Sequence, residues 1–437
     1  RKKEAPLSPP PSPPPPAPAR GAMGIVEKIK ELEHEYARTQ KNKATEGHLG
    51  LIKAKLAKLR SELLQEEGSG GGGAAGEGFA VQRSGDGRVA LIGFPSVGKS
   101  SLLSELTGTK SEAAAYEFTT LTCLPGNIEY KDTKIQLLDL PGIIEGAAHG
   151  KGRGREVIAV ARSSDLVLIV LDAAKEGVDN HRAILERELE TVGLRLNKTP
   201  PNVTLTKKKT GGCKIAATVP LTKLGADPQK TVFDILKEYK LHNVEVLIRE
   251  DVDTDQIIDV IMGNRKYVRC LYVYNKIDAV TLEEIDQLAR KPHSYVISVH
   301  LALGLDYLLE AMWDAMGLVR VYTKRKGAPP DLADPVVLSE QRHGLCTVEA
   351  AAGRISRELL KVFHFAWVWG TSVKFSPQRV GLAHVLHDED VLQVVTKTNH
   401  MQKLDKDYSM KVQAYNKAIA DKRKVRTKEG KKKRSTG

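Results

Sequence analysis

Eight consecutive residues of this chain have the types and spacing of a phosphate-binding loop. Residues 93–100 read Gly-Phe-Pro-Ser-Val-Gly-Lys-Ser and match the pattern G-x-x-x-x-G-K-[ST]. The glycines allow backbone N–H groups to turn toward phosphate oxygens, and the amino end of the following helix adds a favourable field. Lys99 supplies a positive charge to the β- and γ-phosphates, and the Ser100 hydroxyl is suited to binding Mg²⁺. The pattern therefore predicts a nucleoside-triphosphate site.

A second motif, Asp139-Leu140-Pro141-Gly142, ends an apolar run further along the chain. Its carboxylate can hold Mg²⁺ through water, and the Gly142 N–H can sense the γ-phosphate. Between the two motifs, residues 118–122 read Phe-Thr-Thr-Leu-Thr. A threonine here can bind Mg²⁺ only when the γ-phosphate is present, and we assign this role to Thr120 rather than Thr119. The alternative is that the threonines are β-strand formers.

A third motif, Asn275-Lys276-Ile277-Asp278, separates guanine from adenine. The Asp278 carboxylate can accept hydrogen bonds from N1–H and the 2-amino group of guanine, a donor pair that adenine lacks. After the next strand, Ser298 and Val299 stand where a backbone contact to guanine O6 is expected, with valine in place of the usual alanine. Together the three motifs predict a site for GTP and GDP.

The candidate nucleotide-binding residues all lie in these loops. They are Gly93, Phe94, Pro95, Ser96, Val97, Gly98, Lys99, Ser100, Ser101, Phe118, Thr119, Thr120, Asp139, Gly142, Asn275, Lys276, Asp278, Ser298 and Val299. Ser100 and Thr120 are the candidate metal ligands.

The catalytic group is not identified by the sequence, although Thr120, Asp139 and Gly142 are implicated. Ile143 stands where many signalling GTPases carry a glutamine that orients the attacking water. Hydrolysis should therefore be slow alone, or assisted by another group, a monovalent cation or a partner. The Gly-rich, basic stretch 145–155 suits a switch. One of its arginines could act on phosphate, or the run could be solvated or bind a partner.

Short apolar runs, each ending in polar residues, place these motifs on strands of a parallel sheet covered by helices. The runs are 89–92, 135–138, 166–171, 271–274 and 296–297. About a hundred residues separate Asp172 from Leu271, more than one βα connection needs, so an inserted domain is expected. Its residues 232–239 should be helical.

The flanking segments differ in character. Residues 1–22 are Pro-rich, and we expect a disordered extension or a ligand of a proline-reading module. Residues 24–64 carry two helical apolar stripes joined by the basic link 38–43. This pattern predicts an αα-hairpin whose tip is either solvated or touches RNA or protein. Residues 348–363 should form one helix against a short sheet.

Charge and composition exclude some classes. Lys plus Arg is 67 and Asp plus Glu is 54, a net charge of +13. Residues 397–437 carry +10 of this and residues 1–20 carry +3, so the body sums to zero and a uniformly basic nucleic-acid-coating protein is disfavoured. Four scattered cysteines without a C-x-x-C pattern suggest neither a zinc ribbon nor a disulfide framework. The scattered cysteines fit a reducing compartment, and no apolar run is long enough to span a membrane, so we expect a cytoplasmic protein.

The ordered motifs resemble those of the translation-factor-related GTPases, and within them the Obg-like branch. Residues 93–100, 116–122 and 138–146, with Ala-Arg-Thr-Gln-Lys-Asn-Lys-Ala-Thr at 37–45, are similar to the developmentally regulated GTP-binding proteins of the second eukaryotic type. The resemblance runs from about residue 23 to residue 397. Ser101 departs from it, since the family usually has threonine there.

The resemblance implies an α/β fold with a P-loop GTPase domain, an inserted small α+β domain and a C-terminal β-grasp (TGS) domain. It also implies ribosome association, a regulatory protein that stabilises the chain, and hydrolysis favoured by K⁺, although some potassium-using relatives carry asparagine where Ser96 stands. The expected segments are a Pro-rich extension at 1–22, a helix-turn-helix arm at 23–66, a Gly-rich linker at 67–87, the GTPase domain at 88–176 and 246–317, an S5-like insert at 177–245, the TGS domain at 318–396 and a basic tail at 397–437.

Three functions remain open at this point. The first is a slow GTPase switch on translating ribosomes, in which Mg²⁺ and GTP order the loops near Thr120 and Asp139. The second is a scaffold that binds nucleotide without hydrolysing it, which Ile143 favours. The third is an RNA-binding protein that uses its basic loops and tail.

Overall fold

The computed structural model describes residues 20–66 except 41 and 44, residues 84–107, 124–140 and 161–398 except 192, and the isolated positions 401, 415 and 417. The predictions for Phe118, Thr119, Thr120 and Gly142, for the segment 145–155 and for most of both tails lie outside these residues. The chain forms two compact units. The first takes its residues from Arg1–Arg83, Val89–Gly126 and Leu137–Leu305, and the second from Ser84–Arg88, Asn127–Gln136 and Asp306–Gly437.

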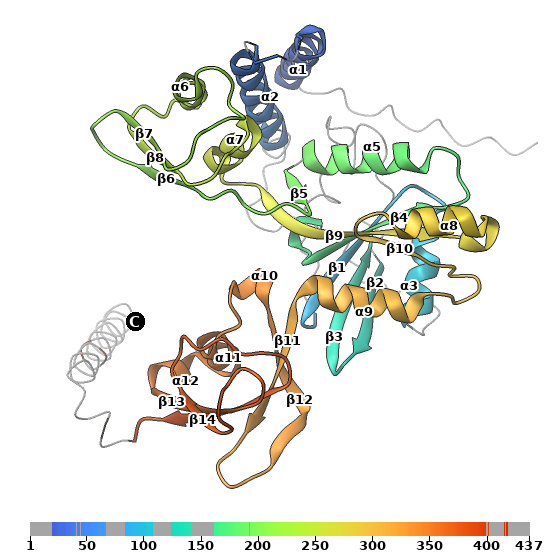
Figure 1. The fold of residues 1–437 in the computed structure, drawn as a ribbon, viewed down its shortest axis with the longest axis vertical. Coiled ribbons are helices and arrows are strands. Elements are labelled where there is room, and N and C mark those ends of the chain that lie inside the picture. The colour runs from blue at the N-terminus through green and yellow to red at the C-terminus, as the bar shows by residue number, and fades with distance from the viewer. Residues whose placement is uncertain are drawn as a thin grey trace, which may run out of the picture. The chain divides into compact units, whose positions relative to one another are not determined.

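A seven-stranded sheet forms the centre of the region that carries the three motifs (Figure 1). Five of its strands coincide or overlap with the predicted apolar runs, and β2 and β5 were not predicted. Its order is β10-β9-β4-β1-β3-β2, with β5 paired to β9, and β1, β4, β9 and β10 run parallel. Buried leucines, isoleucines and valines fill β4 because the sheet is covered on both faces. The strands are β1 Gly87–Ile92, β2 Leu124–Tyr130, β3 Thr133–Asp139, β4 Leu166–Asp172, β5 Leu194–Leu196, β9 Lys266–Asn275 and β10 Ser294–Val296.

Helices follow these strands in the alternation expected of an α/β fold. The helix α3 begins at Lys99, directly after the phosphate loop. The others connected to the sheet are α5 Val178–Thr191, the short 3₁₀ helix η2 Ile277–Ala279, α8 Leu282–Ala289 and α9 Leu305–Met316, with α3 spanning Lys99–Thr107.

The inserted domain is a three-stranded sheet with two helices. The strands have the order β6-β8-β7, and the core includes Val232, Ile235 and Val246. The helix expected at 232–239 is present but begins earlier, because the Asp227 side chain accepts a hydrogen bond from Lys230 N and caps it. The elements are β6 Val203–Lys207, β7 Cys213–Ala217, α6 Pro228–Glu238, β8 Val244–Ile248 and α7 Thr254–Met262.

The expected bounds of this insert, 177–245, were wrong at both ends. The segment with α5 and β5 belongs to the large sheet, because β5 pairs with β9. At the other end β8 continues to Ile248 and pairs with both β6 and β7 along its length. A boundary after residue 245 would cut this central strand.

The N-terminal segment forms the predicted helical hairpin, α1 Arg20–Arg38 and α2 Glu46–Glu66. Ile29, Ile52 and Leu56 are buried between the two helices. The opposite side of α2 packs on the insert: Ala54 is fully buried in the core of the insert, and its carbonyl accepts a hydrogen bond from Tyr239 Oη at 3.1 Å. Figure 1 shows α2 beside α6 and α7.

The second unit contains a five-stranded sheet of order β12-β11-β15-β13-β14. The single helix predicted over 348–363 was wrong. At Ser356 the backbone is extended (φ −162°, ψ 133°), and its hydroxyl caps a second short helix by accepting from Glu358 N. The elements are β11 Leu318–Lys324, β12 Pro330–Ser339, α10 Glu340–His343, α11 Val348–Ile355, α12 Arg357–Lys361, β13 Phe363–Trp369, β14 Gln378–Val380 and β15 Asp390–Thr396.

No helix among the described residues is long and apolar enough to cross a bilayer.

Candidate nucleotide-binding site

The polar residues of the site lie where the central strands end. In the parallel pairing of β4 with β9, Asp172 lies opposite Asn275. The strand β1 leads into Gly93, and β3 ends at Asp139. Because the carboxyl ends of parallel strands share one edge of a sheet, three motifs that are distant in the sequence meet there.

The phosphate loop is folded around the Lys99 side chain. Lys99 Nζ donates to the carbonyl oxygens of Gly93 and Phe94, each at 3.0 Å. Burial lowers the pKa of Lys99, although the nearby Asp139 charge opposes this. Gly98 has φ +95°, and a Cβ at this position would lie 2.4 Å from Asn275 Nδ2. The close approach of the two motifs therefore requires a glycine.

Ser100 and Asp139 form a pair suited to a hard cation. Ser100 Oγ donates to Asp139 Oδ2 at 2.5 Å. The other oxygen, Asp139 Oδ1, is buried and has no hydrogen-bond partner among the residues that the structure describes. Burial raises the pKa of Asp139, against the effects of the Ser100 hydrogen bond and the Lys99 charge. A hydroxyl beside a carboxylate with an unused buried oxygen fits Mg²⁺, which prefers oxygen ligands.

Asn275 connects the base-recognition motif to the phosphate loop. Its Nδ2 donates to Val97 O at 2.9 Å, and its Oδ1 accepts from Val299 N at 3.1 Å. The side chain is almost fully buried. The Val299 N–H, one of the expected contacts to guanine O6, is thus already used within the protein.

Lys276 makes a second connection that the sequence reasoning did not include. It has φ +67°, and its Nζ donates to Ser96 O at 3.0 Å and to Asp172 Oδ2 at 2.6 Å. Asp172 was not among the predicted site residues. Its place at the end of the most apolar strand was the only signal that could have indicated it.

Asp278 is exposed, and its carboxylate is held in place by Ser298. Ser298 Oγ donates to Asp278 Oδ1 at 2.6 Å and accepts from Leu301 N at 3.2 Å. This hydrogen bond lowers the pKa of Asp278, whose exposed carboxylate is charged at neutral pH even at its ordinary pKa. The serine hydroxyl therefore contributes more than the backbone contact expected of it, because it orients the Asp278 carboxylate, the predicted acceptor for guanine.

The structure thus brings together the predicted residues of the phosphate loop, Asp139 and the base-recognition motif. This arrangement matches the domain models found by comparison. Residues 88–207 match the model described as "50S ribosome-binding GTPase", residues 210–318 match the model for the C-terminal region of that domain, and residues 319–396 match the TGS domain. Fold and site together define a P-loop GTPase with a C-terminal TGS domain.

Comparison with curated proteins identifies the family. The chain is 62% identical over 376 residues to "Developmentally-regulated G-protein 2" of Arabidopsis thaliana, covering 86% of this chain and 92% of that protein. It is 59% identical over 375 residues to "Developmentally-regulated GTP-binding protein 2" of Homo sapiens, covering 86% and 100%. The chain belongs to the family of developmentally regulated GTP-binding proteins, which confirms the resemblance seen in its motifs.

Among solved structures, the chain is similar to the YchF GTPase of Schizosaccharomyces pombe, with 14% identity and a TM-score of 0.40. The match covers 72% of this chain and 99% of that one.

Proposed function

We propose that this protein is a slow, magnesium-dependent GTP-hydrolysing switch that acts on translating ribosomes in the cytoplasm. The observation that carries the proposal is the contact between Ser100 and Asp139. It joins the phosphate loop to the first residue of the Asp139–Gly142 motif, so binding of GTP at one affects the other.

The structure has a residue for base recognition, for phosphate binding and for metal binding. Asp278 accepts hydrogen bonds from guanine, and Ser298 orients its carboxylate. Lys99 can exchange the carbonyls of Gly93 and Phe94 for phosphate oxygens. Ser100 and Asp139 would hold Mg²⁺, which neutralises charge on the phosphates when bound.

Slow hydrolysis follows from the residue after Gly142. The Ile143 side chain has no hydrogen-bonding group, so it cannot orient water as glutamine does in other GTPases. We propose that K⁺ and the ribosome raise the rate. The test is multiple-turnover phosphate release with K⁺ against Na⁺, with and without ribosomes. A flat baseline in every condition would instead support the alternative function, a nucleotide-bound scaffold.

Ribosome association has its own test. Polysome gradients of the wild-type protein and Ser100→Asn, combined with a nucleotide-dependent pull-down, should show the wild type in the ribosomal fractions and a shifted distribution for the variant. Equal distributions of the two proteins would show that ribosome binding does not depend on the nucleotide site.

The proposed function also includes two kinds of partner, a regulatory protein and RNA. We propose a regulatory protein that stabilises the chain and RNA contacts through basic loops and residues 397–437, where the net charge is +10. Deletion of this tail should weaken RNA binding and reduce its dependence on salt. Unchanged binding would remove the tail from the interface.

A further inference from the structure

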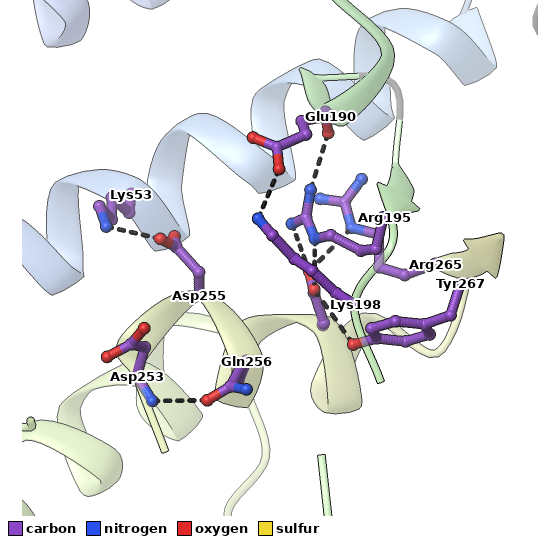
Figure 2. A network of polar contacts seen from close by, with 10 residues as sticks. Lys53, Glu190, Arg195, Lys198, Asp253, Asp255, Gln256, Arg265 and Tyr267 are labelled. Carbon is purple, nitrogen blue, oxygen red and sulfur yellow. Dashed lines mark hydrogen bonds and ion pairs between the residues drawn. The ribbon is translucent and has the colours of Figure 1, made fainter. Parts of the chain in front are cut away.

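A charged cavity of about 950 Å³ lies in the first unit, away from the predicted nucleotide contacts. Its lining comes from the hairpin helices α1 and α2, from α5 and β5, from α7 and from the amino end of β9. Figure 2 shows its polar contacts. The strand β9 connects two sites, because Tyr267 near its start lines the cavity and Asn275 at its end belongs to the nucleotide site.

The floor of the cavity is a buried ion pair between Arg195 of β5 and Asp259 of α7. Arg195 Nε donates to Asp259 Oδ2 at 2.6 Å, and Arg195 Nη2 donates to Oδ1 at 2.7 Å. Arg195 Nη1 donates to Glu190 O at 2.9 Å. Only 3% of the Asp259 side chain is exposed. This two-point geometry satisfies both oxygens of the carboxylate.

Arg265 brings a second positive charge to the same carboxylate. Its Nε lies 3.2 Å from Asp259 Oδ1, which is an ion-pair distance, but the geometry is not that of a hydrogen bond. This Nε is buried and has no hydrogen-bond partner among the described residues, and 11% of the side chain is exposed. A buried guanidinium with an unused N–H is unfavourable unless a further acceptor reaches it.

The surroundings of Arg265 strengthen this imbalance. Burial lowers the pKa of Arg265, the Asp259 charge opposes this, and the positive charge of Arg195 lowers it further. Arginine nevertheless stays protonated in proteins, so two cations share one anion. Gly193 makes room for the guanidinium, since a Cβ there would lie 2.6 Å from Arg265 Nη1.

The rest of the lining carries the balancing negative charge. Six acidic and six basic side chains line the cavity, so it is neutral overall. At the rim these charges pair with each other: Lys198 Nζ is 2.5 Å from Glu190 Oε1, and Arg60 Nη2 is 2.6 Å from Glu33 Oε1. At the floor, Arg195 and Arg265 exceed Asp259 by one positive charge, and the other side chains of the lining carry one net negative charge.

We propose that this cavity binds the phosphate group of a small molecule, with Arg265 as the main contact and the Tyr267 hydroxyl as a second donor. The planar fork of arginine matches phosphate oxygens. Tyr267 Oη is 3.4 Å from Asp259 Oδ2, a long contact that leaves it able to turn to a ligand. Burial raises the pKa of Tyr267 to about 12, so the hydroxyl keeps its proton at neutral pH. The volume accommodates a molecule larger than phosphate itself.

The test is calorimetric titration of the full-length protein with inorganic phosphate, AMP and ribose 5-phosphate. The protein is first saturated with Mg²⁺ and a non-hydrolysable GTP analogue, so the phosphate loop is filled. We expect one binding site for at least one of the three probes. Tightest binding of inorganic phosphate would indicate a free-phosphate site, and tighter binding of AMP or ribose 5-phosphate an esterified one. Absence of binding by all three overturns the proposal.

Two variants test whether the anion binds at Arg265 on the floor of the cavity. Arg265→Gln should weaken binding by about tenfold or more, since a charged hydrogen-bond donor is lost. Arg290→Gln, which changes an exposed arginine on the surface of the same unit, is the matched control and should have no effect. Binding that is unchanged in Arg265→Gln would place the anion elsewhere and overturn the proposal.

A third variant distinguishes ligand binding from a structural role. Asp259→Asn removes the competing negative charge but keeps an oxygen that accepts from Arg195, so it should tighten anion binding. A purely structural floor predicts equal or weaker binding. Should Arg265→Gln not fold, Arg265→Lys keeps the charge without the fork and should also weaken binding.

Discussion

The two ends of strand β9 present two ways of arranging charge. At the nucleotide site, Lys99 and Lys276 are held by backbone carbonyls of the phosphate loop, with one carboxylate partner for Lys276. In the Arg265 cavity, side chains from separate elements balance one another. At the nucleotide site, backbone carbonyls fix the positions of the two lysines. At the cavity floor, the positions of the side chains depend on the balance between two positive charges and one negative charge. Substitutions at the nucleotide site should therefore mainly change ligand binding, whereas removal of the shared carboxylate in the Arg265 cavity should also lower stability.

The largest effect is expected from Asp259→Ala. This substitution leaves two guanidiniums without their shared buried carboxylate, and losing one partner of a buried pair costs about 3–5 kcal/mol. The measurement is the free energy of unfolding from urea titration. A loss below about 1 kcal/mol would contradict the contrast between the two sites, since the floor would then not depend on its charge balance.

Asp278→Asn tests the nucleotide site. It should weaken GTP binding on the order of 100-fold, because the carboxylate predicted to accept two hydrogen bonds from guanine is replaced by an amide. The same change should admit xanthine nucleotide, whose 2-oxo group accepts where guanine donates. Stability should barely change, because Asp278 is exposed. Unchanged GTP affinity by calorimetry would rule out the assigned base contact.

Ser100→Ala sharpens the metal assignment. Loss of the hydroxyl beside Asp139 should reduce the gain in GTP affinity that Mg²⁺ provides by about tenfold. Ser104→Ala is a matched control on the same helix, because its hydroxyl donates to the backbone oxygen Ser100 O and has no other partner among the described residues. The comparison is of titrations with Mg²⁺ and with a chelator. A wild-type protein whose affinity does not depend on Mg²⁺ would refute the assignment.

The smallest effect is expected from Asp255→Ala, four residues before Asp259 on the same helix. Lys53 Nζ lies 2.6 Å from Asp255 Oδ2, but 51% of the aspartate side chain is exposed, so water and salt screen the pair. We expect a change below about 1 kcal/mol in the free energy of unfolding, decreasing further in high salt. A loss as large as that of Asp259→Ala would mean that exposure does not separate the two aspartates.

Much of the fold and of the nucleotide site was predictable, because its signals are contiguous. The apolar runs indicated buried parallel strands, and polar residues at their ends indicated one shared edge. The residues of 93–100, Asp139 and 275–278 meet there as expected. The helix over 348–363 was not predicted correctly. Ser356 ends one helix and caps the next, and the spacing of apolar residues does not indicate such a break.

By itself, the sequence determined the phosphate loop, the guanine-recognition motif and the hairpin, since each is a local pattern whose residues act within one loop or one helix face. Only the tertiary structure decided the partnership of Asp172 with Lys276 and the meeting of Arg195, Asp259 and Arg265. These side chains come from different elements. Whether a buried charge has a partner depends on distances in the folded structure, and the spacing of residues along the chain does not predict these distances.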